Sequence, residues 1–131
     1  MTSRNTDPVQ HPRKAAEAVR AFNHATQRTR DRHPDVAYPG TVYRAIGAFT
    51  SLAHRLPQSY DQIGAALADL HTAGRLIADY GTPTEHAVTV SEALREAEQH
   101  ATAMAEALER AHRAASPLGY CGPIDDTDDD L

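Results

Sequence analysis

The chain has 131 residues, of which 40% are hydrophobic, and 18 acidic residues against 13 Lys and Arg give a formal net charge of −5. This length suits one domain with three or four helices. The single cysteine excludes an internal disulfide, and no apolar run reaches the roughly 18 residues that span a bilayer. The first residues also lack a hydrophobic signal segment. We therefore expect a cytoplasmic protein, and the excess of arginine over lysine is typical of a GC-rich bacterial genome.

Alanine, leucine, glutamate and arginine fill the middle of the chain, which favours an all-α fold. Residues 1–11 are polar without periodicity and are predicted to form a flexible arm. Pro12 suits the first turn of a helix, and a weak apolar stripe predicts a helix over about 13–32. His33 and Pro34 should end it, because the residue before a proline is disfavoured in the α conformation.

Two helices of medium length are predicted next, over about 41–56 and 58–80. Thr41 is a plausible N-cap for the first, and Pro57 either breaks that helix or begins the next one. Gly74 lies at an apolar position of the second helix. A glycine there indicates either local tolerance or a close approach by the facing helix, and we favour the close approach.

The clearest junction lies at residues 80–83, after which a long helix is predicted over about 83–115. Thr82, Pro83 and Glu85 supply an N-cap, a proline at the first helical position and the glutamate of a capping box. Because the connection is short, the helices on either side should pack as an antiparallel hairpin. The predicted fold is therefore a helical bundle of three to four helices over 12–118, built on this hairpin.

Apolar or small residues in the long helix recur with gaps of four and three, which is typical of an a/d packing seam. They are Val90, Leu94, Ala97, Ala101, Met104, Leu108, Ala111 and Ala115. Facing positions of the preceding helix have the same spacing. The residues predicted to form the interaction seam are Ile63, Leu67, Leu70, Ile77, Leu94, Ala101, Met104 and Leu108.

Alanine is frequent in this seam, so it buries little area per residue and a monomer would be marginally stable. A homodimer, or a complex with another helical protein, would supply the missing area. The first functional hypothesis is therefore a non-catalytic interaction or scaffold protein that uses this seam.

The N-terminal region is rich in basic residues, and this supports an alternative hypothesis, a nucleic-acid-binding accessory protein. Its candidate phosphate contacts are Arg13, Lys14, Arg20, Arg28, Arg30 and Arg32. A solvated charged face is the simpler interpretation. The 33–40 connection is also too long and proline-rich for a helix-turn-helix.

Residues 119–131 end in five closely spaced aspartates and are predicted to form a disordered acidic tail. Such a tail keeps a protein in solution, or it folds over a basic segment or a basic partner. The sequence leaves these roles open.

Catalytic and metal-binding patterns are weak. Glu109 and His112 have the E-x-x-H spacing of di-iron bundles, but the second motif and the further glutamates of such sites are missing. No serine or cysteine lies in the context of an activated nucleophile, and glycines that would form a phosphate loop are scattered singly. We predict no enzyme activity, no metal and no cofactor.

The predicted hairpin loosely resembles the hairpin of the small secreted WXG-type proteins of Gram-positive bacteria. Their Trp-x-Gly turn is replaced by Tyr80-Gly81-Thr82, and Ile124 stands four residues after Tyr120, where their C-terminal signal has an acid. The resemblance covers the hairpin geometry and implies no function.

Overall fold

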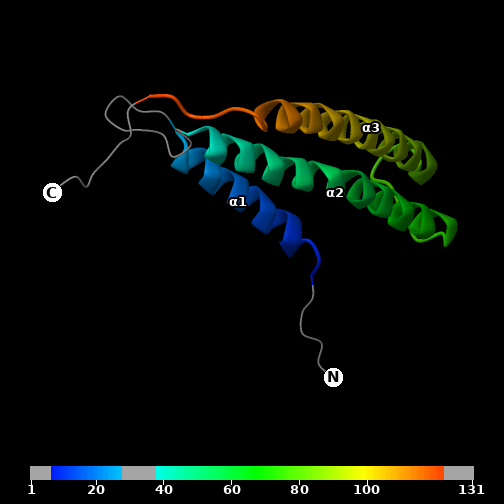
Figure 1. The fold of residues 1–131 in the computed structure, drawn as a ribbon. Helices are drawn as coiled ribbons and strands as arrows, with labels where there is room; N and C mark the ends of the chain where they lie inside the picture. Colours follow the sequence, from blue (N-terminus) through cyan, green and yellow to red (C-terminus); the bar gives the residue numbers. More distant parts are fainter. Residues whose placement is uncertain (1–6, 28–37, 123–131) are drawn as a thin grey trace, which may run out of the picture.

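The computed structural model describes residues 7–27 and 38–122, which form three α-helices and no strand. Helix α1 spans Gln10–Ala25, α2 spans Pro39–Thr72 and α3 spans Pro83–Ala115 (Figure 1). The predicted all-α class is therefore confirmed. Within these ranges, no helix combines the length and the apolar character that a membrane crossing requires.

Helices α2 and α3 lie side by side along their lengths, and the chain turns back between them at residues 73–82 (Figure 1). Helix α1 lies beside the first half of α2, where the rings of Phe22 and Phe49 meet edge to face at 5.1 Å. At about 1.5 Å per residue, the 16 residues of α1 cover only half the length of the 34-residue α2.

Helix α2 is one continuous element with Pro57 inside it, whereas the sequence predicts two helices at 41–56 and 58–80. An interior proline removes one backbone hydrogen bond and disfavours a helix by about 3 kcal/mol. Here α3 runs beside both halves of α2, so packing on each side of Pro57 holds them in one helix. The predicted cap at Thr41 is wrong too, because the helix begins at Pro39 with Tyr38 as N-cap residue.

Helix α2 ends at Thr72, eight residues before the predicted end. Gly74 adopts a left-handed φ of 71°, and its N–H donates to the carbonyl of His71, while the N–H of Arg75 donates to Leu70. This pair of bonds is the Schellman ending of a helix. The interpretation of Gly74 as a site of close helix approach is wrong, because nothing lies within 4 Å of where its Cβ would be.

Helix α3 begins as its capping residues predict. The Thr82 hydroxyl accepts a hydrogen bond of 3.1 Å from the N–H of Glu85, and Pro83 occupies the first turn. Gly81, with a φ of 67°, turns the chain into this cap. Thr82 therefore satisfies one of the backbone donors that a helix N-terminus leaves open.

The chain ends differ from the predicted boundaries. Helix α1 begins at Gln10, inside the predicted arm, where the Asp7 carboxylate accepts a bond from the Val9 N–H. It ends at Ala25. The predicted helix over 13–32 extends further, and its part beyond residue 27 lies outside the described residues. Tyr120, placed in the predicted tail, packs its ring on Tyr38 at 4.8 Å. The aspartates of the tail also lie outside the described residues.

The core of the described chain is small. Its buried hydrophobic residues are four alanines: Ala53, Ala101, Ala105 and Ala115. Helix α1 has no buried residue, and the described part of the chain has no fully buried large side chain. Large apolar side chains at the contacts, such as Leu67, Leu94 and Leu108, are half-buried, so each gains only part of the about 1.5–3 kcal/mol that full burial contributes.

Candidate interaction surface

The α2–α3 interface at the end near Tyr38 is built around a histidine. The imidazole of His112 stacks on the ring of Tyr43, with centroids 4.1 Å apart and planes 14° from parallel. Gly47, one turn after Tyr43, leaves room for this imidazole, since a Cβ there would lie 2.9 Å from Nε2. The close helix approach therefore occurs at Gly47.

Polar pairs continue along the interface. His54 Nε2 and Glu109 Oε2 are 2.5 Å apart, and both side chains are more than one-third exposed. Near the connection, His71 Nε2 lies 2.9 Å from the hydroxyl of Thr84 and links the end of α2 to the start of α3. Exposed pairs of this kind contribute little stability, typically less than about 1 kcal/mol each.

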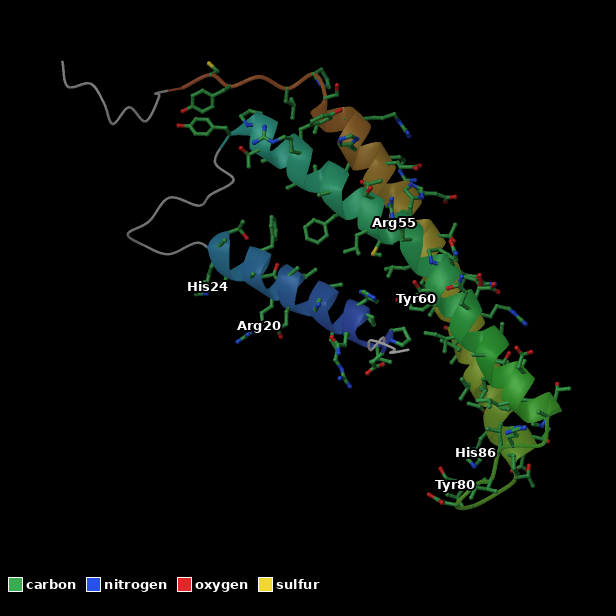
Figure 2. The ribbon with its side chains drawn as sticks, turned by 90° about the horizontal axis from the view of Figure 1, so that it is seen from below. Arg20, His24, Arg55, Tyr60, Tyr80 and His86 are labelled. Carbon is green, nitrogen blue, oxygen red and sulfur yellow. The ribbon has the colours of Figure 1, made fainter. Side chains whose placement is uncertain are left out.

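Beyond these pairs, His86 closes the connection. Its Nε2 is 2.8 Å from the carbonyl oxygen of Tyr80, and the two rings meet edge to face at 4.8 Å. Figure 2 shows both residues at the far end of the helix pair, opposite the end where the chain enters α2.

The predicted seam of α3 divides between two sides of the helix. Leu94, Ala101, Leu108 and Ala115 are half-buried or buried, and Leu94 lies against Gly64 of α2. Ala105 and His112 complete the side that meets α2, although the predicted seam names Met104 and Ala111 instead. A small residue at 105 lets the helices approach closely, and the larger Met104 remains 44% exposed.

The remaining predicted residues of α2 are mostly exposed. Leu67 is half-buried, but Ile63 is 54% exposed and Leu70 is 45% exposed. Ile77 belongs to the connection after α2 and is 94% exposed. The structure therefore brings Leu94, Ala101 and Leu108 to the α2–α3 contact and leaves Ile63, Leu70, Ile77 and Met104 largely uncovered.

These uncovered residues lie on one side of the helix pair. Leu67 and Val90 line the same groove, of about 350 Å³, whose wall at the connection is formed by Leu76, Ile77 and Tyr80. Ile63 and Leu70 are one turn away from Leu67 on the same side of α2, and Met104 is four turns along α3 from Val90. We call this side the open face and define it by Ile63, Leu67, Leu70, Ile77, Val90 and Met104.

The candidate phosphate contacts lie on α1 and beyond it. Arg13, Lys14 and Arg20 are exposed, and Arg20 pairs with Glu17 at 3.4 Å. Figure 2 shows Arg20 on the side of α1 that is turned away from α2. Arg28, Arg30 and Arg32 lie outside the described residues.

The side chains considered as metal ligands or nucleophiles lie apart in the described residues. Over 7–27 and 38–122, no three or more His, Cys, Asp or Glu side chains come together as a metal site. Glu109 and His112 contact α2 separately, through His54 and through Tyr43. Cys121 is exposed.

Comparison with known proteins adds no further information on function. No family model, no curated protein and no solved structure matches this chain.

Proposed function

We propose that this protein is a non-catalytic helical interaction or scaffold protein. In this proposal, α2 and α3 act as an antiparallel hairpin whose open face is covered by helices of another chain, either a second copy or a different helical protein. The predicted nucleic-acid role is the alternative.

The observation that carries the proposal is the contrast between core and surface. The buried hydrophobic residues of the described helices are four alanines, while large apolar residues of the open face stay exposed along about two turns of α2 and about four turns of α3. Apolar side chains that gather around one exposed groove, as Leu67, Ile77 and Val90 do, mark a site of interaction. Covering it would add the large buried side chains that the described chain lacks.

The charge of α1 favours this proposal over nucleic-acid binding. The exposed side chains of Arg13, Glu17, Arg20 and His24 recur with gaps of four, three and four, so they share one side of the helix. Glu17 lies in the middle of that row and pairs with Arg20. An acid among the bases weakens the attraction of this row for phosphates.

Thermal unfolding of the full chain at increasing protein concentration, with a dye that binds exposed apolar surface, tests the proposal. We expect either a melting temperature that rises with concentration or, if the partner is a different protein, a poorly cooperative melt with strong dye binding. A monomer that melts cooperatively, at a temperature independent of concentration, without binding dye would overturn it.

The variant Ile63→Ser/Leu70→Ser should reduce either signal. Its control is Leu118→Ser, because Leu118 is 65% exposed but lies after α3, away from the open face. Equal effects of the two changes would count against the open face as the binding surface.

A further inference from the structure

We propose that the open face binds a basic amphipathic helix of another protein, seated beyond α1 on the same side of α2. This inference rests on the proposed function and names the chemistry of the partner. Three observations support it: the packing of α1, the exposure along one side of α2, and the charge of the segment that forms the groove.

One apolar row of α2 is covered along its first half and uncovered along its second. Its members recur every seven residues, so they share one side of the helix: Phe49, Leu56, Ile63 and Leu70. Phe49 and Leu56 are half-buried, whereas Ile63 and Leu70 are exposed. No described helix other than α3 lies beside this second half (Figure 1). The row therefore continues past the place where α1 packs.

Helix α1 shows which kind of element the row accepts. Its half-buried residues are Ala15, Val19 and Phe22, which share one side of the helix. The ring of Phe22 meets that of Phe49 at 5.1 Å. The helix carries three bases and one acid, a net charge of +2, and all four of these side chains are exposed. A basic amphipathic helix thus already packs on the first half of the row.

The segment that forms the uncovered half is acidic. Residues 58–98 are all described and carry seven acids and two bases, a net charge of −5. The rest of the chain has eleven acids and eleven bases, so this segment carries the net charge of the whole protein. In the groove itself, Asp79 lies beside Ile77 and Tyr80. Such a surface attracts a cationic partner and disfavours an anionic one.

The groove also requires an apolar side on the partner, since Leu67, Ile77 and Val90 line it. An amphipathic helix meets both requirements, because it places apolar residues in a groove and keeps its charged residues at the edges.

A second copy offers no free helix of this kind among its described helices. The apolar side of its α1 packs on its own α2 through Phe22 and Phe49, and its uncovered half is acidic. A helix from a different protein is therefore the occupant that the described residues support.

A designed peptide tests the inference by fluorescence anisotropy with the full chain at low salt. The basic peptide has about 20 residues, which span about 30 Å as a helix, with leucine at the a and d positions and lysine or alanine elsewhere. The control peptide has glutamate in place of each lysine. We expect the basic peptide to bind with a dissociation constant at least about tenfold lower than that of the acidic peptide. High salt should reduce this difference.

Two pairs of variants locate the bound peptide. Ile63→Ser/Ile77→Ser should raise the dissociation constant at least about tenfold, whereas Leu118→Ser should leave it unchanged. Asp79→Lys should raise it at least about threefold more than Asp61→Lys, which changes the net charge equally. Asp61 is the matched control because it lies two residues before Ile63, on nearly the opposite side of α2. The substituted side chains are all exposed, so the helix pair should stay folded.

The inference and the proposed function fail in different ways. Equal binding of the two peptides, or equal effects of Asp79→Lys and Asp61→Lys, would show that the partner is not selected for basic charge. Weaker binding by Ile63→Ser/Ile77→Ser would then still support the proposed function.

Absence of binding by the basic peptide would also overturn the inference. Self-association of the parent chain that Ile63→Ser/Ile77→Ser abolishes would then identify a second copy as the occupant. A cooperatively folded monomer that binds neither peptide nor dye would overturn the proposed function as well.

Discussion

A Cβ atom at Gly47 would stand 2.9 Å from Nε2 of His112, closer than side chains pack. Because the imidazole also stacks on Tyr43 at 4.1 Å, it has little freedom to move away. Gly47 is therefore where α2 makes room for a side chain of α3, at the end of the helix pair that is nearest Tyr38.

Gly64 provides a matched test of this relationship, since it also lies inside α2. A Cβ at Gly64 would be 3.8 Å from Leu94, an ordinary contact. We expect Gly64→Ala to raise the free energy of unfolding by about 1 kcal/mol, through helix propensity alone. Gly47→Ala should raise the free energy of unfolding by less than this, or lower it. Urea unfolding at one fixed protein concentration compares the two.

Removal of the imidazole provides the control for Gly47. The change Gly47→Ala should become more favourable when it is made in a His112→Ala background, because the contact that opposes it is gone. Equal effects of Gly47→Ala and Gly64→Ala in the parent chain would show that the close contact between position 47 and His112 does not affect stability.

The left-handed conformation of Gly74 predicts a cost for any side chain there. Gly74→Ala should destabilise the chain by about 1–2 kcal/mol, because a Cβ clashes with the backbone in that conformation. Gly119→Ala is the control, as Gly119 has no positive φ and no neighbour within 4 Å of its Cβ position. A Gly74→Ala protein with the parent melting temperature would contradict this account of the α2 ending.

Pro57 should be a destabilising residue that α2 tolerates. Replacing it with alanine restores an N–H that can donate to the carbonyl of Ala53, and we expect a gain of up to about 3 kcal/mol. Pro83→Ala should change stability far less, because the N–H at the first helical position has no acceptor within its helix. Guanidinium unfolding of the two variants checks the contrast. A loss of stability in Pro57→Ala would show that the proline fits a bend that the interface requires.

The cap of α3 predicts a selective effect at Thr82. Thr82→Ala should cost about 1 kcal/mol, since the N–H of Glu85 loses its acceptor, and Thr82→Ser should retain most of the stability. Circular dichroism melts distinguish these outcomes, and equal losses for the two variants would argue against the hydroxyl bond.

Local signals in the sequence predicted the helical class and the start of α3. Thr82, Pro83 and Glu85 specify a cap through short-range hydrogen bonding, so no distant residue is needed to read it. Pro57 shows the opposite case. Its local preference is to end a helix, but α3 packs along both halves of α2, and that contact is not visible in a short stretch of sequence.

The side of α3 that meets α2 was predictable only in part. Its apolar stripe is wide enough for two contacts, so periodicity alone identifies Leu94, Ala101 and Leu108 but cannot choose between Met104 and Ala105. The close approach of α2 and α3 favours the small Ala105 at the contact, and Met104 stays exposed. The contacts of Tyr43 and His112 were missed because both residues are polar at their tips, although Gly47 inside a helix was a signal that something approaches there.

The most direct test of the proposed function is sedimentation equilibrium of the full chain over a wide concentration range, with the Ile63→Ser/Ile77→Ser variant beside the parent. If the partner is a second copy, the account predicts a concentration-dependent dimer for the parent and a dissociation constant at least about tenfold higher for the variant. If the partner is a different helical protein, it predicts a poorly cooperative monomer that binds the dye, and weaker dye binding by the variant. A parent chain that remains a cooperatively folded monomer at every concentration, with no exposed apolar surface detected by dye, would contradict it.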